Sequence, residues 1–204
     1  MDFLNSIILL TNFIIVPGIT YGSQLALGAI GVTLIYGVLR FANFAYGDLM
    51  AFGTMVVILM TWYLQSKGIS FGLLPTALLA LPIGILLTIA VSLFFDKTVF
   101  EYYRNKKSNP VTFIVVSLGI MFVLNAVVRI IIGPNDINFM DGHKFIMKAR
   151  EFKQLTGLNE GLAIKSTQVI TLVTTIITCS ILFYFLNKTK TGKSMRAYSN
   201  NEDL

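Results

Sequence analysis

Charged and amide side chains beside long apolar runs are the first candidates for chemistry in this chain. Arg40, Asn43 and Asp48 stand close together, and apolar sequence flanks them on both sides. An ionisable group at membrane depth is costly and usually has a function, so this turn could lie against a path that carries a solute across a bilayer. The alternative is structural: Arg40 would extend to the interface, Asn43 would close a turn, and Asp48 would cap a helix that starts at Leu49.

The residue types needed for catalysis or metal binding are scarce. One Cys and one His exclude a disulfide framework and a His/Cys metal cluster. The apolar runs contain no Ser–His or Asp–Asp pair, so intramembrane proteolysis is disfavoured and no catalytic residue is assigned. The segment Thr191-Gly192-Lys193-Ser194 resembles the end of a phosphate-binding loop, but Asn187 stands where the first glycine is required. We therefore expect no enzymatic activity, no metal and no cofactor.

Two single residues have both a functional and a structural interpretation. Arg129, near the outer end of a span, could meet an anionic solute, but we expect its side chain to extend past residues 130–132 to the surface. Cys179 is expected to behave as a small apolar residue within a span.

The composition indicates the environment of these residues. The 204 residues are 55% hydrophobic and only 13% charged, with a mean hydropathy of +0.74. A soluble domain has about 25% charged residues. The net charge of +6 is spread in short clusters between apolar runs, which does not form the basic face that nucleic-acid binding requires. These values exclude a typical soluble enzyme and a disordered chain, and they indicate an all-α polytopic membrane protein.

Runs without Asp, Glu, Lys or Arg predict about five membrane-spanning helices, because each needs about 20 mostly apolar residues to cross a core of about 30 Å. Pro17-Gly18 is expected to interrupt the first run and leave a short lead-in before the helix. Pro75 and Pro82 predict a kink or a late start of the third helix, and Asn109-Pro110 predicts the start of the fourth. The predicted spans are residues 19–39, 49–66, 68–95, 108–128 and 166–187.

Basic residues in the connections predict the orientation. Segments 96–109 and 188–204 each carry four Lys or Arg residues. The positive-inside rule places both segments, and the connection at Arg40, in the cytoplasm. The N-terminus and the loop 133–166 are then outside and the C-terminus is cytoplasmic.

Small residues in the first span favour close helix packing. Gly18 and Gly22 form a G-x-x-x-G pattern, and Gly28, Gly31 and Gly37 continue it. Small side chains let helix backbones approach each other in a membrane. We expect these glycines to pack within the chain, with a subunit interface as the alternative.

Parts of the sequence resemble the permease subunits of branched-chain amino acid ABC importers. Residues 21–37 and the following Asn43-Phe-Ala-Tyr-Gly-Asp48 are similar to that family's opening stretch, "ALxAlGlxliyG" and then "NFAHGE". Tyr46 replaces the family's His, which removes a titratable ring, and Asp48 replaces Glu, which keeps the carboxylate. Ser117-Leu-Gly119 with Asn125 resembles the family's fourth-span region.

The end of the chain resembles the start of the same family's cytoplasmic loop, "GraxRAxaxdxxxAxxxGI". The resemblance implies a permease domain over residues 1–204 and an ATPase-docking loop that begins at 188–204. The implied coupling residues of this loop are Gly192, Lys193, Arg196, Ala197, Glu202 and Asp203. The implied candidates along the translocation path are Asn43, Tyr46, Asp48, Ser117 and Asn125.

The resemblance also implies partners and a location. These are a second homologous permease, two cytoplasmic ABC ATPases that hydrolyse the ATP, and a periplasmic or lipid-anchored substrate-binding protein. The location would be the cytoplasmic membrane of a bacterium or archaeon. Urea, short amides or another amino acid are alternative substrates, and a secondary transporter is a further alternative.

Family members continue beyond the cytoplasmic loop, and the Ala and Gly-Ile expected after Asp203 do not follow here. The sequence therefore predicts a C-terminal truncation or a fragment, and a chain that does not transport alone. A truncated, non-transporting membrane protein is the last alternative.

Overall fold

The computed structural model of the chain describes residues 2–72, 74–133, 135, 139, 141 and 145–200. The chain divides into two compact units. The terminal unit comprises Met1–Val38 and His143–Leu204, and the central unit comprises Leu39–Gly142.

Five helical segments within the described residues are long and apolar enough to cross a membrane, which confirms the predicted all-α polytopic class. They are Phe3–Leu39, Ala45–Ser66, Ala77–Asn105, Pro110–Ile132 and Ser166–Lys188.

The first segment of the terminal unit is one continuous helix, so the predicted interruption at Pro17 is wrong. It consists of α1 (Asp2–Leu10), a π-helical turn η1 (Thr11–Ile15) and α2 (Val16–Leu39). Pro17 has no N–H to donate to the carbonyl four residues earlier. The wider turn before it, in which the Val16 N–H donates to the Thr11 carbonyl, shifts the hydrogen bonding by one residue and lets the helix continue.

The central unit contains α3 (Ala45–Ser66), α4 (Ala77–Phe95), η2 (Asp96–Phe100), α5 (Glu101–Asn105) and α6 (Pro110–Ile132). The late start of the third span is confirmed, and Pro82 lies inside α4. Asn109 stands at the N-cap position of α6 with Pro110 in its first turn, as predicted, but the Asn109 side chain makes no capping hydrogen bond.

The prediction that segment 96–109 is a loop is wrong over most of its length, because the helix continues through η2 and α5 to Asn105. A bidentate ion pair supports this extension: Arg104 Nη1 and Nη2 lie 2.7 and 2.9 Å from the two carboxylate oxygens of Asp96. Basic residues therefore do not by themselves indicate the end of a helix.

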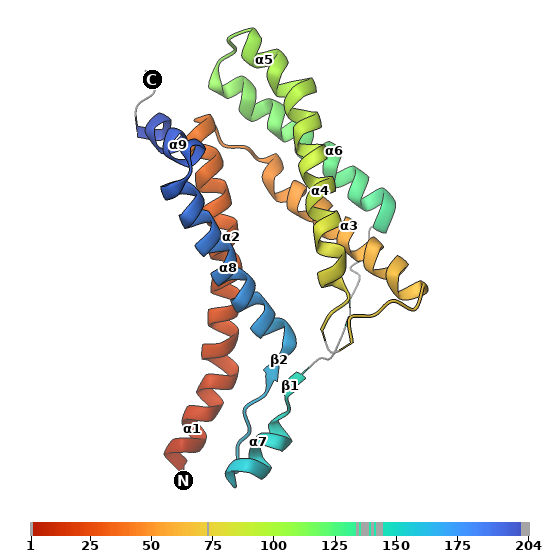
Figure 1. Ribbon diagram of the computed structural model, residues 1–204, viewed down its shortest axis with the longest axis vertical. Coiled ribbons are helices and arrows are strands. Elements are labelled where there is room, and N and C mark those ends of the chain that lie inside the picture. Colours follow the sequence, from red (N-terminus) through yellow and green to blue (C-terminus); the bar gives the residue numbers. More distant parts are fainter. Residues whose placement is uncertain are drawn as a thin grey trace. The chain divides into compact units, whose positions relative to one another are not determined.

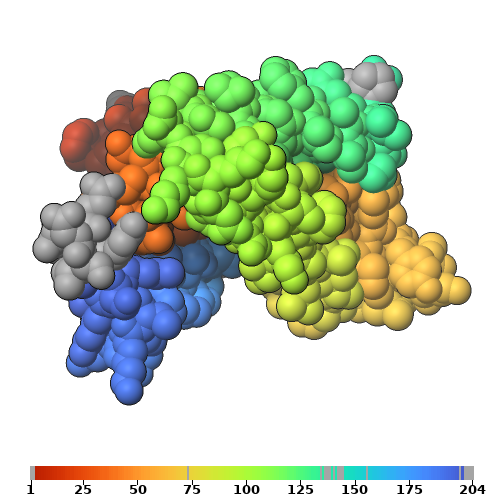
Figure 2. All heavy atoms as spheres, turned by 90° about the horizontal axis from the view of Figure 1, so that it is seen from above, coloured from red at the N-terminus to blue at the C-terminus, as the bar shows by residue number. Residues whose placement is uncertain are grey.

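The packed centre of the central unit lies where α3 meets α6. The rings of Phe41, Phe100 and Phe113 pack together with centroids 5.1 to 6.5 Å apart, and Ala45 and Leu124 are buried beside them. α3 packs against both α4 and α6 (Figure 1), and η2 lies side by side with α6 (Figures 1 and 2). The short segment before α3 is thus fixed by aromatic packing.

The remainder of the terminal unit contains β1 (Phe145–Met147), α7 (Ala149–Thr156), β2 (Ile164–Lys165), α8 (Ser166–Lys188) and α9 (Lys190–Asn200). β1 and β2 form a two-stranded antiparallel sheet. The segment predicted as the external loop 133–166 therefore carries two strands and a helix. The segment predicted as the docking loop 188–204 is helical over residues 190–200.

Candidate functional site

The turn between α2 and α3 is built by Arg40 and Asn43. Arg40, directly after the end of α2, has a φ of 59°, in the left-handed region that residues other than glycine seldom adopt. Asn43 Oδ1 accepts a hydrogen bond from the Ala45 N–H (3.1 Å), and the Asn43 carbonyl accepts one from the Tyr46 N–H (3.3 Å). The prediction that Asn43 closes a turn is confirmed. Tyr46 takes part in this turn through its backbone N–H, and Tyr46 itself is half-buried.

Ser117 holds this turn against α6. Its hydroxyl is fully buried, accepts a hydrogen bond from the Phe44 N–H (3.1 Å) and donates one to the Ile114 carbonyl (2.8 Å). Ser117 lies about 10 Å along α6 from Pro110, at 1.5 Å per residue. The start of α3 is therefore opposite the second turn of α6.

Asp48 does not cap a helix, which corrects the structural interpretation made from the sequence. α3 already begins at Ala45, so Asp48 lies inside its first turn. The Asp48 carboxylate instead accepts a hydrogen bond from Asn125 Nδ2 (3.0 Å), and Asn125 Oδ1 accepts one from Arg129 Nε (2.9 Å). Arg129 thus donates to a residue of its own helix, which differs from the expected extension past residues 130–132 to the surface. We call Asp48, Asn125 and Arg129 the polar triad.

The polar triad places two charges within membrane-spanning helices. Asn125 lies about 22 Å along α6 from Pro110, which is about three quarters of the thickness of a hydrocarbon core of about 30 Å. Asn125 and Arg129 are exposed within the described chain. Charged groups within membrane-spanning segments usually face a water-filled cavity or another protein surface rather than lipid. The arrangement can therefore contact a polar solute.

The structure brings together four of the five predicted path residues through side-chain hydrogen bonds. Their hydrogen bonds lie across or beside the junction of α3 and α6, and the four residues are Asn43, Ser117, Asp48 and Asn125. Arg129 extends the group. Arg129 stands four residues after Asn125, on the same helical face, and this spacing is the sequence signal from which their contact could have been predicted.

The predicted coupling segment forms a tight elbow between α8 and α9. Thr189 Oγ1 donates to the Phe185 carbonyl (2.6 Å) and accepts from the Gly192 N–H (3.0 Å). A Cβ at Gly192 would collide with the Phe185 carbonyl oxygen and would lie 2.6 Å from Leu186 Cα. Gly192 therefore permits the close contact, and its amide is engaged by Thr189. The exposed residues of α9 include Lys193, Arg196 and Ala197, while Glu202 and Asp203 lie outside the described residues.

The glycines of α2 have different surroundings. Within the described residues, no atom lies within 4 Å of a Cβ built at Gly18, Gly22 or Gly28, whereas one at Gly37 would lie 3.3 Å from Ser199 Oγ. Gly31 lies on the same helix. The packing partner of this face stays a prediction.

A close helix contact that was not predicted joins α3 to α4. A Cβ at Gly53 would lie 2.6 Å from Thr88 Oγ1, and one at Gly84 would collide with Val57. The Thr88 hydroxyl donates to the Gly84 carbonyl (2.7 Å), so both polar groups are satisfied at the crossing. The sequence signal is a glycine followed four residues later by a threonine in an apolar run.

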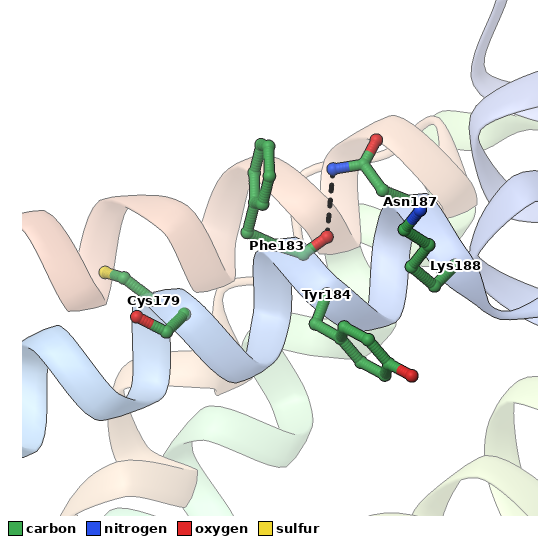
Figure 3. Close-up of a pocket in the computed structure, with 6 residues that line it drawn as sticks. Cys179, Phe183, Tyr184, Asn187 and Lys188 are labelled. Atoms are coloured by element: carbon green, nitrogen blue, oxygen red, sulfur yellow. Dashed lines mark hydrogen bonds between the residues drawn. The ribbon is translucent and has the colours of Figure 1, made fainter.

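Two hollows lie apart from the polar triad. A groove of about 590 Å³ between α3 and α4 is mainly apolar. Figure 3 shows another along α8, where Asn187 Nδ2 donates to the Phe183 carbonyl (2.9 Å). The labelled residues of this hollow all come from the one helix and are Cys179, Phe183, Tyr184, Asn187 and Lys188. Within the described residues, no group of three His, Cys, Asp or Glu side chains could hold a metal ion.

Comparison with known proteins gives a consistent result. The profile of the family described as "Branched-chain amino acid transport system / permease component" matches residues 14–204. Relatives named "High-affinity branched-chain amino acid transport system permease protein LivH", from Escherichia coli strain K12 and Salmonella typhimurium, are 26% identical over 191 residues, which is 92% of this chain and 58% of each relative.

The similarly named BraD of Pseudomonas aeruginosa is 25% identical over 199 residues, which is 93% of this chain and 59% of BraD. The chain thus spans less than two thirds of the length of these relatives. No solved structure matches the chain. Because the family profile matches almost the entire sequence, the chain belongs to the family of branched-chain amino acid transport system permease components.

Proposed function

We propose that the chain is the membrane permease subunit of an ABC importer for branched-chain amino acids. The observation that carries this proposal is the family match over residues 14–204, which includes all the elements that form the polar triad and the elbow. The names of the relatives LivH and BraD supply the substrate class. The five apolar segments agree with a multi-pass protein, and we place it in a bacterial cytoplasmic membrane.

The proposed partners are a second homologous permease, two cytoplasmic ABC ATPases and an external substrate-binding protein. We assign the exposed, basic α9 to ATPase docking. Closure of the ATPases on ATP would push α9, and the tight elbow at Gly192 would transmit the movement to α8. This transmission would switch the spans between outward and inward access.

Uptake of labelled leucine tests the function. The chain is expressed with its partner subunits in cells that lack their own branched-chain amino acid systems. We expect uptake that stops when ATP is depleted. Uptake that survives ATP depletion but stops when the ion gradient collapses would establish a secondary transporter instead, and uptake of urea in place of leucine would change the substrate class.

Two variants test the assignment of α9. Gly192→Val should force α9 away from α8, and Arg196→Glu should reverse a charge on its exposed surface. Both should lower leucine uptake by about tenfold or more, since each removes a docking or transmission contact, while membrane insertion stays normal. Lys153→Glu, the same type of charge reversal on α7, is the matched control and should keep its uptake. Full, ATP-coupled uptake in both α9 variants would contradict the assignment.

A further inference from the structure

The polar triad has an unusual arrangement of charges. The one ion pair among the described residues joins Arg104 to Asp96, so Asp48 and Arg129 do not meet directly. The neutral amide of Asn125 stands between them, 3.0 Å from the Asp48 carboxylate and 2.9 Å from Arg129 Nε. Opposite charges in an apolar medium are stabilised by direct contact or by ligands of opposite charge.

We infer that Asp48 and Arg129 form a binding site for an α-amino acid zwitterion, in which Asp48 binds the ammonium group and Arg129 binds the carboxylate. This inference deepens the proposed function and rests on it for the substrate class. In the structure, the Asn125 amide stands between these two charged groups.

The polarity of the Asn125 amide supports this assignment. Its nitrogen donates toward Asp48, and its oxygen accepts from Arg129. An amino acid presents the same order of groups: its ammonium donates and its carboxylate accepts, with two carbon atoms between nitrogen and oxygen. The amide nitrogen and oxygen are separated by one carbon atom. A zwitterion therefore presents the same sequence of donor and acceptor, and it would take the place of the Asn125 amide between the two charges.

The triad retains the hydrogen-bonding capacity that a substrate needs. In the described part of the chain, Asp48 Oδ2 and the two terminal nitrogens of Arg129 make no hydrogen bond. A guanidinium can bind a carboxylate through two parallel hydrogen bonds, and these charge-assisted bonds are stronger than those to a neutral amide. The zwitterion carries both an ammonium and a carboxylate group. Its replacement of the Asn125 amide is therefore favourable both at Asp48 and at Arg129.

This site predicts which ligands are rejected. An analogue without the ammonium group, 4-methylpentanoate, leaves Asp48 unpaired. An analogue without the carboxylate, 3-methylbutylamine, leaves Arg129 unpaired. Both keep the apolar portion of leucine, so a merely apolar surface would bind all three compounds alike.

Saturation-transfer NMR on the full chain in lipid nanodiscs tests the inference, because this method detects weak binding. We expect a leucine signal that excess valine removes. The two analogues should bind at least about tenfold more weakly, the effect of losing a charge-assisted hydrogen bond. Asp48→Asn should abolish the preference for leucine over 4-methylpentanoate, and Arg129→Gln should abolish the preference for leucine over 3-methylbutylamine.

Asp96→Asn and Arg104→Gln are the matched controls, since they remove the same charged groups from the ion pair elsewhere in the central unit. Both should keep the wild-type preferences. Asp48→Glu keeps the carboxylate and should retain leucine binding, which separates loss of charge from loss of folding; circular dichroism verifies the helix content of every variant. Equal signals from leucine and both analogues in the wild-type chain, or unchanged preferences in Asp48→Asn and Arg129→Gln, would overturn the inference.

The uptake assay separates this inference from the proposed function. If ATP-dependent leucine uptake occurs while the preferences do not depend on Asp48 and Arg129, the permease function stands and the zwitterion site is wrong. If the preferences depend on both residues but no ATP-dependent uptake is found, the site stands and the permease function is wrong.

Discussion

Ser117 shows how one buried hydroxyl positions the start of a helix. It accepts the Phe44 N–H that the chain exposes just before α3 and that has no helical partner. Ser117→Ala should leave this N–H unpaired in an apolar environment, at a cost of about 1–3 kcal/mol. Hydrogen exchange of the Phe44 amide should accelerate about tenfold for each 1.4 kcal/mol lost.

Ser180→Ala is the control for this prediction. Its hydroxyl donates only to the Ile176 carbonyl of its own helix, so its removal should leave amide exchange at Phe44 unchanged. An unchanged Phe44 amide in Ser117→Ala would show that the turn does not depend on this contact.

The roles of the site residues were partly predictable from the sequence, because some depend on neighbouring residues in the chain and others depend on tertiary contacts. Asn43 could be assigned to a turn since asparagine commonly accepts from nearby backbone N–H groups. Asp48 was misassigned as a cap because its true partner, Asn125, is distant in sequence. No local pattern indicates such a pair, so the triad required the packing of α3 on α6.

At the scale of helices, the crossing of α3 and α4 depends on small residues. Gly84→Val should collide with Val57 and push the helices apart, with a loss of about 1–3 kcal/mol from overpacking. Trp62, the single tryptophan, lies in α3 and reports thermal unfolding by fluorescence. We expect a lower unfolding midpoint.

Gly119→Val makes the same substitution inside α6, where nothing lies within 4 Å of the added Cβ among the described residues. It should unfold near the wild-type midpoint. Equal midpoints for Gly84→Val and the wild type would mean that the α3–α4 contact is not tight.

The helical segments themselves were predictable from apolar runs, but their ends were not. The start of α6 was correct since Pro110 strongly favours a first turn. Pro17 and the residues after Phe95 were misjudged for a common reason: at both places a π-helical turn, η1 or η2, keeps the backbone helical. A π turn adds one residue to a helix without a characteristic composition, so the sequence carries no signal for it.

At the scale of the chain, the contacts agree with alternating spans. Phe44 meets Ser117 and Asp48 meets Asn125, so α3 and α6 run in the same direction. Gly53 approaches Thr88 and Val57 approaches Gly84, so α3 and α4 run in opposite directions. Two spans that begin on the same side of a membrane must be separated by one that returns, as α4 does.

Cysteine labelling tests the predicted orientation. With Cys179→Ser as background, Glu151→Cys should react with a membrane-impermeant maleimide in intact cells. Lys106→Cys and Arg196→Cys should react only after permeabilisation, because the positive-inside rule places these basic segments in the cytoplasm. Labelling of Lys106→Cys in intact cells, with none at Glu151→Cys, would reverse the orientation.

The amide spacer between Asp48 and Arg129 has an electrical consequence. When a single elementary charge crosses the whole membrane, a membrane potential of 100 mV changes its free energy by about 2.3 kcal/mol. The triad carries one negative and one positive charge, so the voltage does almost no net work when the three side chains move together. A bound zwitterion is also neutral. The membrane potential would therefore neither drive nor oppose a movement of the triad with its bound zwitterion. The energy to accumulate the amino acid would have to come from another source.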